Sequence, residues 1–186
     1  MPTEASAGEL GTVAAPRVIA VIGGECSGKS TLANALAQDL DAVLAVEELR
    51  KFVEEYGRPP LVNEQAAVMA RQIAAEAAAA SAAAQQCKNW VVGDPGALMT
   101  AVYSVAYFDD DSLLPAAVEH QACYAWTLWC DIDLPWRADG VQRDGPHERQ
   151  RVHDVIDDVV HRYSLDVVRI AGSVNERVDQ VRRLLA

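Results

Sequence analysis

The sequence lacks the features of membrane proteins, secreted proteins and zinc proteins. It has no uninterrupted apolar run of the roughly 20 residues that a membrane-spanning helix needs, and residues 1–16 have neither the basic start nor the apolar centre of a secretion signal. Its 4 cysteines show no Cys-x-x-Cys or Cys/His spacing, so we expect reduced thiols rather than disulfides or a metal site. These absences predict a soluble, cytoplasmic protein with a disordered tail at residues 1–16.

Positive charge and histidine are also scarce. The chain has 16 Lys and Arg residues against 27 Asp and Glu residues, and its formal net charge is −11. A field of this sign repels nucleic acids and anionic membranes, so we expect a small-molecule partner, with homo-oligomer formation left open. The length suits one domain, residues 17–186. The 4 histidines show no ligand spacing and are expected at the surface: His120, His147, His153 and His161.

One stretch carries a specific phosphate-binding motif. Residues 23–31 read Gly-Gly-Glu-Cys-Ser-Gly-Lys-Ser-Thr and match the pattern G-x-x-x-x-G-K-[ST] at every fixed position. In this pattern the backbone N–H groups of a glycine-rich loop surround an anion, and the N-terminus of the next helix adds its dipole. Lys29 would add positive charge, and Ser30 would place its hydroxyl on Mg²⁺. The predicted nucleotide-binding residues are Gly24, Glu25, Cys26, Ser27, Gly28, Lys29, Ser30 and Thr31.

Apolar runs of strand length alternate with helical patterns along the chain. The runs are residues 18–22, 42–46, 90–93, 124–130 and 166–170. This alternation predicts an α/β fold with a parallel sheet of about five strands and right-handed crossovers. Because ligands bind beyond the carboxyl ends of strands in such sheets, the glycine loop should lie close to Glu47, Asp94 and the segment after Asp131.

Three segments between these runs have a distinct character. Residues 63–86 form an alanine-rich stretch that predicts a long packed helix without chemistry. Residues 131–148 carry prolines, glycines and mixed charge without periodicity, which predicts a long loop that acts as a lid before a helix at 149–163. Residues 173–176 read Ser-Val-Asn-Glu, a capping box that should open the last helix.

Asp94 follows the third apolar run directly, where the acid of a phosphate-loop protein holds Mg²⁺. The alternative is a turn residue that caps the following helix. Pro95 and Gly96 stand where an ATPase would have a glutamate to activate water, which disfavours a hydrolytic motor. A guanine-reading Asn-Lys-x-Asp motif is also missing, which weakens a GTPase reading. Phosphoryl transfer to an acceptor other than water is therefore favoured.

Several residues near the predicted carboxyl edge of the sheet could bind or activate the phosphoryl acceptor. Glu47 could take a proton from a substrate hydroxyl, although an ion pair with Arg50 is the alternative. Arg137, Arg143 and Arg149 straddle the loop and could close onto the phosphates as the loop folds down, which would exclude water. Trp136 could stack on a planar ring or pack the loop against the core.

The chain resembles the ribosylnicotinamide kinase domain of NadR-type proteins and the AAA-like ATP-binding domains grouped with it. The resemblance rests on the glycine loop, on Glu47 with Arg50, and on residues 133–140, Asp-Leu-Pro-Trp-Arg-Ala-Asp-Gly, with Arg149 downstream. Order and spacing agree from about residue 18 to the C-terminus.

This resemblance implies a P-loop kinase, a three-layer sandwich with strand order 2-3-1-4-5, that uses MgATP to phosphorylate the ribose 5′-hydroxyl of nicotinamide riboside. The implied catalytic residues are Lys29, Glu47, Asp94 and Arg149, the metal ligands are Ser30 and Asp94, and the substrate-binding residues are Glu47, Arg50, Trp136 and Asp139.

The sequence departs from the family pattern on the acceptor side. Asp94-Pro95-Gly96 replaces Asp-Thr-Asp, residues 47–51 read Glu-Glu-Leu-Arg-Lys in place of Glu-Tyr-x-Arg-Glu, and Gln142 stands where an arginine is expected. The family's ATP-binding residues can therefore be assigned to this sequence more fully than its acceptor-binding residues. Two alternatives stay open: an ATP-binding regulatory module without turnover, and a kinase for a small molecule that is not a nucleoside.

Overall fold

Five short parallel strands form the middle layer of the protein. The computed structural model describes residues 14–136 and 145–186. The strand order is β2-β3-β1-β4-β5, and all four pairings are parallel, which confirms the predicted fold class and order. The strands are β1 (Arg17–Ile22), β2 (Val43–Ala45), β3 (Trp90–Gly93), β4 (Trp126–Cys130) and β5 (Val168–Ile170).

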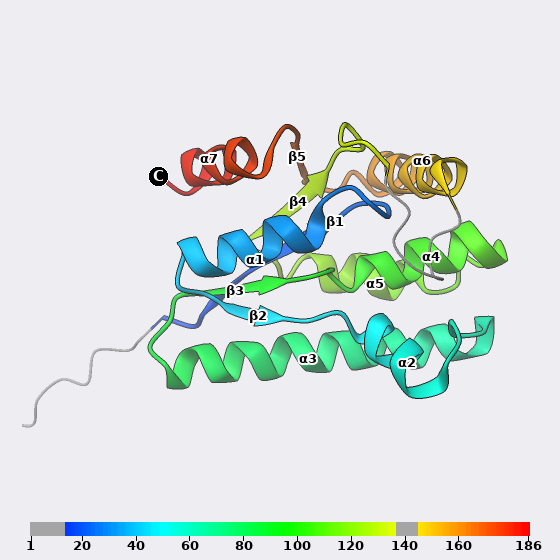
Figure 1. The fold of residues 1–186 in the computed structure, drawn as a ribbon. Coiled ribbons are helices and arrows are strands. Elements are labelled where there is room, and N and C mark those ends of the chain that lie inside the picture. Colours follow the sequence, from blue (N-terminus) through cyan, green and yellow to red (C-terminus); the bar gives the residue numbers. More distant parts are fainter. Residues whose placement is uncertain (1–13, 137–144) are drawn as a thin grey trace, which may run out of the picture.

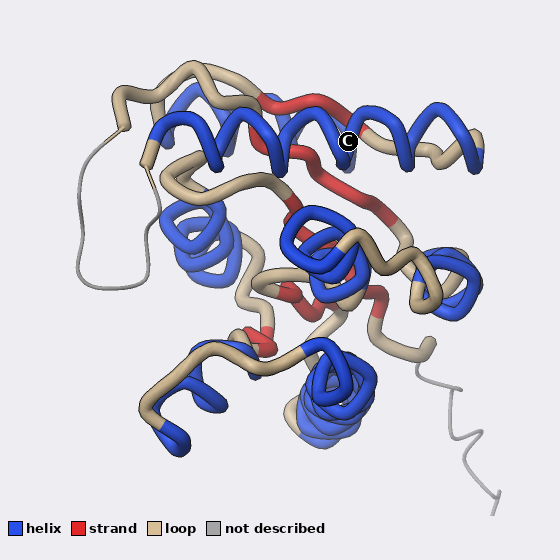
Figure 2. The backbone as a smooth tube through the Cα atoms, turned by 90° about the vertical axis from the view of Figure 1, so that its right-hand side faces the viewer, coloured by secondary structure: helices blue, strands red, loops and turns tan. Residues whose placement is uncertain are grey.

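Helices cover both faces of this sheet (Figures 1 and 2). One face packs against α1 and α7, and the other packs against α3, α4, α5 and α6, while α2 lies on α3. The helices are α1 (Lys29–Asp39), α2 (Glu48–Tyr56), the 3₁₀ helix η1 (Val62–Glu64), α3 (Gln65–Gln85), α4 (Leu98–Phe108), α5 (Leu114–Gln121), α6 (Pro146–Tyr163) and α7 (Val174–Leu185).

Strand β1 is apolar on both faces because helices cover both faces of the sheet. Ile19 and Val21 point to the side of α1 and α7, and Ile22 joins the cluster on the opposite side. All four residues from Ile19 to Ile22 are fully buried. The glycine loop therefore follows a strand whose last four residues are fully buried.

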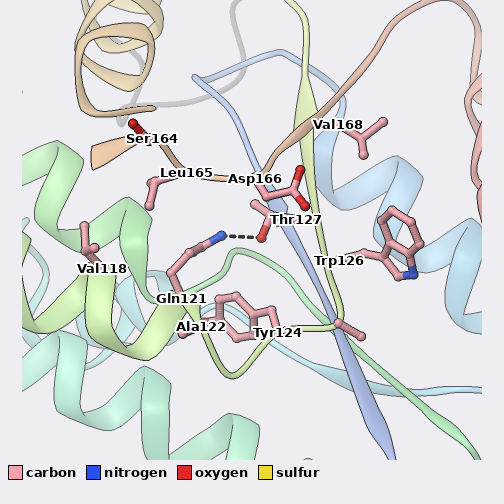
Figure 3. A pocket seen from close by; sticks show the side chains of 11 residues that line it. Val118, Gln121, Ala122, Tyr124, Trp126, Thr127, Ser164, Leu165, Asp166 and Val168 are labelled. Atoms are coloured by element: carbon pink, nitrogen blue, oxygen red, sulfur yellow. Dashed lines mark hydrogen bonds between the residues drawn. The ribbon is translucent and has the colours of Figure 1, made fainter. Parts of the chain in front are cut away.

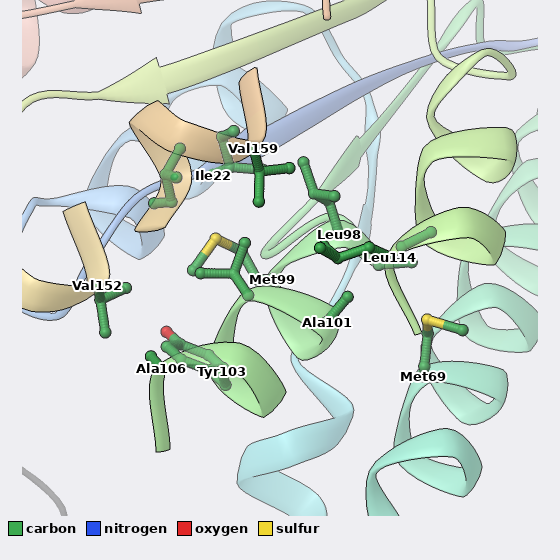
Figure 4. Packing of buried hydrophobic residues seen from close by; sticks show 14 of the residues in the cluster. Ile22, Met69, Leu98, Met99, Ala101, Tyr103, Ala106, Leu114, Val152 and Val159 are labelled. Carbon is green, nitrogen blue, oxygen red and sulfur yellow. The ribbon is translucent and has the colours of Figure 1, made fainter. Parts of the chain in front are cut away.

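Helix α4 forms the centre of the larger core cluster. Eight of its 11 residues are buried, and they contact β1, α3, α5 and α6 (Figure 4). Met99 and Tyr103 lie in this cluster beside Val152 of α6. Burying one large apolar side chain stabilises a fold by about 1.5–3 kcal/mol, so this helix anchors the layer that lies beneath the sheet.

The helix boundaries differ in places from those predicted. Helix α6 begins at Pro146, three residues before the predicted start, because proline is favoured in a first helical turn, where its missing N–H is not needed. The long helix α3 begins at Gln65 after a 3₁₀ turn that contains Asn63, the predicted cap. The capping box at Ser173 is confirmed, with the Ser173 N–H donating to the Glu176 carboxylate at 2.8 Å.

The prediction that all four histidines lie at the surface is wrong for two of them. His153 is buried and its ring packs on Trp129 with centroids 4.9 Å apart, because its position on α6 faces the sheet. Burial lowers the pKa of His153, so the neutral ring is favoured there. His120 is half-buried and lies 2.9 Å from a carboxylate oxygen of Glu76.

The sheet register brings the predicted site segments together. Gly93 of β3 is level with Ala20 of β1 and with Ala45 of β2, and Ile22 is level with Trp129 of β4. The segments that follow these strands therefore leave the sheet at the same edge. Within the described part of the chain, no helix is both long enough and apolar enough to cross a membrane.

Candidate nucleotide-binding site

The glycine loop between β1 and α1 requires a special backbone. Gly23 has φ +147° and Gly28 has φ +85°, and Cys26 also adopts a left-handed conformation with φ +53°. A Cβ atom at Gly23 would lie 2.8 Å from the Ser27 Oγ atom and 2.9 Å from the Cys130 carbonyl oxygen. The loop therefore holds its curve only with glycine at position 23.

The loop and the start of α1 present donors that a phosphate can use. Gly28 is the N-cap residue of α1, and no side chain caps the helix. Lys29 Nζ donates to the Gly24 carbonyl oxygen at 2.8 Å, and Ser27 Oγ donates to the same oxygen at 2.7 Å. The first turn of α1 thus offers uncapped N–H groups beside an ammonium group, which is the arrangement that binds anions.

Asp94 is buried directly after β3. Its N–H donates to the Ala45 carbonyl oxygen at 2.9 Å, and its side chain belongs to a residue only 7% exposed. The next helix, α4, has Ala97 as its N-cap and no side-chain cap, so the alternative of Asp94 as a helix cap is wrong. Asp94 Oδ1 is buried and has no hydrogen-bond partner among the described residues. A buried carboxylate oxygen without a donor is costly, and a cation would satisfy it.

Tyr103 of α4 is buried within range of three negatively charged side chains. Burial raises the pKa of Tyr103 well above its ordinary value, and the negative charges of Glu47, Glu25 and Asp94 raise it further. These residues come from the start of α2, the glycine loop and the end of β3. The structure thus brings Glu47 and Asp94 into one region, as the sequence predicts.

Glu47 also makes the alternative contact that the sequence left open. Its Oε2 atom lies 3.7 Å from Nε of Arg50, and the Arg50 side chain is 59% exposed. A pair this exposed contributes at most about 1 kcal/mol, so a ligand could displace it at little cost.

Arg149 of α6 contacts the glycine loop through its guanidinium group. It donates to the carbonyl oxygens of Leu134 at 2.8 Å, Ile132 at 3.0 Å and Cys26 at 3.5 Å. The side chain therefore ties α6 to the loop after β4 and to the phosphate-binding loop. Arg149 thus lies beside the glycine loop, and its predicted catalytic role stays a prediction.

Arg177 is a site residue that the sequence reasoning missed. Its side chain is 1% exposed, and its guanidinium group donates to the carbonyl oxygens of Ser27 at 2.6 Å and Gly172 at 2.8 Å. It also pairs with the Asp133 carboxylate at 2.5 Å. From the sequence, an arginine between apolar helix positions is expected to point into solvent, which is why Arg177 was missed. Its position in the first turn of a helix that follows the carboxyl end of a strand could have indicated that it lies near the site.

The predicted acceptor-binding residues Trp136 and Asp139 follow β4 in the sequence, and the predicted metal ligand Ser30 follows Lys29. Trp136 is half-buried, and its Nε1 atom has no acceptor among the described residues. Asp139 falls outside the described residues, as do Arg137 and Arg143. Ser30 follows Lys29 on the first turn of α1, as its predicted metal role requires.

A cavity of about 350 Å³ lies at the opposite edge of the sheet (Figure 3). It is lined by the last turn of α5 and by the amino ends of β4 and β5, including Gln121, Thr127 and Asp166. The glycine loop follows the carboxyl end of β1, so this cavity is separate from the candidate site. Among residues 14–136 and 145–186, no cluster of three or more His, Cys, Asp or Glu side chains could hold a metal ion.

Solved structures share this fold. A NadR protein in complex with NR has a TM-score of 0.70 and is 20% identical over 86% of this chain, which spans only 44% of that protein. A thymidylate kinase from Ehrlichia chaffeensis has a TM-score of 0.66 at 16% identity, covering 93% of this chain and 100% of that one. A deoxyadenosine kinase from M. mycoides has a TM-score of 0.61 at 10% identity, covering 90% and 98% of the two chains. No curated protein matches the sequence.

At these identities the likeness shows a P-loop fold of the nucleoside and nucleotide kinase type. A P-loop domain of this type implies nucleotide binding, in agreement with the geometry of residues 23–31. A family described as an AAA domain matches residues 18–177, which is most of the chain, and this protein therefore belongs to that family of P-loop AAA domains.

Proposed function

We propose that this protein is a MgATP-dependent kinase for a small nucleoside-like acceptor, with the 5′-hydroxyl of nicotinamide riboside as the acceptor. The observation that carries the proposal is the position of Asp94 and Glu47 just after the paired strands β3 and β2, at the sheet edge where the glycine loop begins. The likeness to a NadR protein in complex with NR and to nucleoside kinases supports it. No glutamate follows Asp94 to activate water, which favours transfer to an acceptor over hydrolysis.

The donor half of the site would bind the phosphates of ATP. Lys29 is held by the Gly24 carbonyl oxygen at 2.8 Å, so nucleotide binding exchanges that bond for bonds to phosphate oxygens. A charge-assisted bond to phosphate is stronger than a bond to a carbonyl group, so the exchange favours the bound state. The N–H groups of the first turn of α1 add to this attraction.

The metal ligands in this proposal are Ser30 and Asp94. The buried Asp94 Oδ1 atom, which has no donor among the described residues, fits this role. Mg²⁺ commonly uses one or two protein ligands together with phosphates and water, so a dedicated cage of acidic side chains is not needed. When bound, the ion would neutralise charge on the phosphates during transfer.

Glu47 is the proposed base on the acceptor side. Its carboxylate accepts the proton of the acceptor hydroxyl as that oxygen bonds to the γ-phosphorus. The bond between the γ-phosphorus and the bridging oxygen breaks, and ADP leaves with that oxygen. Arg50 and Trp136 would position the acceptor, with the indole ring stacked on its planar base. Arg149 would reach the phosphates by releasing its carbonyl partners.

The test is an incubation of the protein with MgATP and nicotinamide riboside, followed by chromatography of ADP and the mononucleotide. We expect both products in equal amounts, and their loss in Glu47→Gln with ATP affinity preserved. Glu54→Gln, an exposed glutamate of the same helix, is the matched control and should keep full activity. Absence of turnover with nicotinamide riboside and with other nucleosides would refute the proposal.

A second candidate is an ATP-binding regulatory module without turnover. Two observations favour it: the Glu47 carboxylate is paired with Arg50, and Pro95-Gly96 replaces the acidic pattern of the family after Asp94. It predicts tight ATP binding without transfer to any acceptor. A thermal-shift screen of acceptors separates the two and also covers acceptors that are not nucleosides, because a ligand at about 100 times its Kd adds about 2.7 kcal/mol of stability.

A further inference from the structure

A buried carboxylate lies in the middle of the alanine-rich helix α3. Glu76 is only 3% exposed, and no side chain of that stretch was expected to carry chemistry. Three donors converge on it: Tyr124 Oη donates to Glu76 Oε2 at 2.9 Å, His120 Nε2 lies 2.9 Å from the same oxygen, and Gln72 Nε2 donates to Oε1 at 3.5 Å. Burial and the Glu76 charge both raise the pKa of Tyr124, so its hydroxyl keeps the proton that it donates.

The hydrogen bonds continue from Glu76 to the backbone of the candidate site in two directions. In one direction, the Ala97 N–H donates to Tyr124 Oη at 3.0 Å, three residues after Asp94. In the other, the Glu48 N–H donates to Gln72 Oε1 at 3.0 Å, directly after Glu47. One continuous chain of hydrogen bonds therefore links the segment that carries the proposed metal ligand to the segment that carries the proposed base.

We propose that Glu76 is a positioning residue that fixes the distance between Asp94 and Glu47 through Tyr124 and Gln72. This inference rests on the proposed kinase function. The Asp94 N–H already donates to the Ala45 carbonyl oxygen, which joins the two segments at the ends of their strands. The Glu76 network adds a second connection beyond the strand ends, to the Ala97 N–H on one side and to the Glu48 N–H on the other. A misplacement of about 1 Å between reacting groups can lower a rate by about 100-fold, which is the scale on which such a residue acts.

The residue type at position 76 follows from its partners. All three neighbours are donors, and a carboxylate has only acceptor oxygens. In a Glu76→Gln variant, one of the two side-chain oxygens becomes an NH₂ group that faces a donor, so at least one contact is lost. A Tyr124→Phe variant removes only the bridge between Glu76 and the Ala97 N–H. Both variants keep the shape of the side chain.

The experiment compares Glu76→Gln and Tyr124→Phe with wild type, using Glu119→Gln as the matched control, an exposed glutamate of α5 beside His120. Kinetics are measured at a temperature at which circular dichroism shows every variant to be folded. We expect kcat to fall by about 10-fold to 100-fold in both test variants, with the KM for ATP within about twofold of wild type. The kcat of the double variant should be no lower than that of the less active single variant, because both substitutions break the same chain of hydrogen bonds. A kcat within about twofold of wild type in both folded variants would overturn the inference.

A second measurement separates this inference from the proposed function. The affinity for a non-hydrolysable ATP analogue is measured in Mg²⁺ and in EDTA. In Tyr124→Phe we expect the affinity gain from Mg²⁺ to fall by at least about threefold while the affinity in EDTA is unchanged. If wild type turns over no acceptor and this loss is still seen, the kinase proposal fails and the positioning role of the network stands. An unchanged gain from Mg²⁺ would refute the positioning of Asp94 through Tyr124.

Discussion

Replacing Arg177 by methionine should destabilise the protein, because the buried guanidinium group donates to two carbonyl groups that no other described side chain reaches. The methionine side chain keeps most of the buried stem but leaves the Ser27 and Gly172 carbonyl oxygens without their donor. The Ser27 bond is buried, and an unsatisfied buried group costs about 1–3 kcal/mol, whereas the Gly172 bond is partly exposed and its loss costs less. The Asp133 side chain is 33% exposed and can return to water, so its lost ion pair adds little. The expected loss is about 2–4 kcal/mol.

For a chain of this length, 1 kcal/mol corresponds to about 2–4 °C in Tm, so a loss of about 3 kcal/mol lowers Tm by about 6–12 °C. Thermal unfolding followed by circular dichroism measures this shift. Arg183→Met, an exposed arginine of the same helix, is the control and should change stability by less than about 0.5 kcal/mol. Arg177→Lys should fall between the two, since an ammonium group cannot reproduce the planar fork. A Tm of Arg177→Met within about 2 °C of wild type would show that these bonds contribute little.

Three further changes test the glycine loop and the surface. Lys29→Ala should weaken ATP binding strongly in calorimetry, and unchanged affinity would contradict the phosphate-binding role of the loop. Gly23→Ala should cost about 1–3 kcal/mol in urea unfolding, because its Cβ meets Ser27 Oγ at 2.8 Å at a φ of +147°; equal midpoints would argue against strain. Arg58 holds the pKa of Glu64 at about 2, below its ordinary value of 4.5, so this pair stabilises the fold above pH 4.5 and loses its effect as the pH falls towards 2. The Tm difference between wild type and Glu64→Gln should therefore shrink between pH 6 and pH 2.5, and a constant difference would exclude this linkage.

The strands were predictable because apolar runs in a covered parallel sheet are continuous. Strand β3 was predicted to the residue, since polar Asn89 and Asp94 bound its apolar run. The predicted fourth strand began two residues early, at Tyr124. The aromatic ring of Tyr124 resembles a strand residue in sequence, but its hydroxyl group serves the Glu76 network instead of the sheet. Whether the hydroxyl group of a tyrosine is buried depends on the tertiary structure and cannot be predicted from the neighbouring sequence.

The phosphate-binding half of the site was predictable for a different reason: each of its parts is recognised from a short stretch of sequence. Residues 23–31 build the loop, and Asp94 follows its strand directly. Arg177 and Glu76 have partners far along the chain, since Arg177 contacts Ser27 across 150 positions and Glu76 contacts Tyr124 across 48. A usable signal existed in α3, where Gln72 and Glu76 occupy the same helix face as its buried apolar residues. Polar residues at core positions four apart indicate a buried network.

The hydrogen bonds from Arg149 and Arg177 to backbone carbonyl groups at the carboxyl edge of the sheet have a common physical origin. Where strands end, the ladder of backbone hydrogen bonds ends too, and the loops that follow carry carbonyl groups that need other donors. Arg149 and Arg177 satisfy such carbonyl groups on two sides of the glycine loop, and each guanidinium group reaches several at once. Asp94 Oδ1 lies at the same edge and is buried, yet no donor among the described residues approaches it. In the proposed kinase, a Mg²⁺ ion held by Ser30 and Asp94 would satisfy this oxygen.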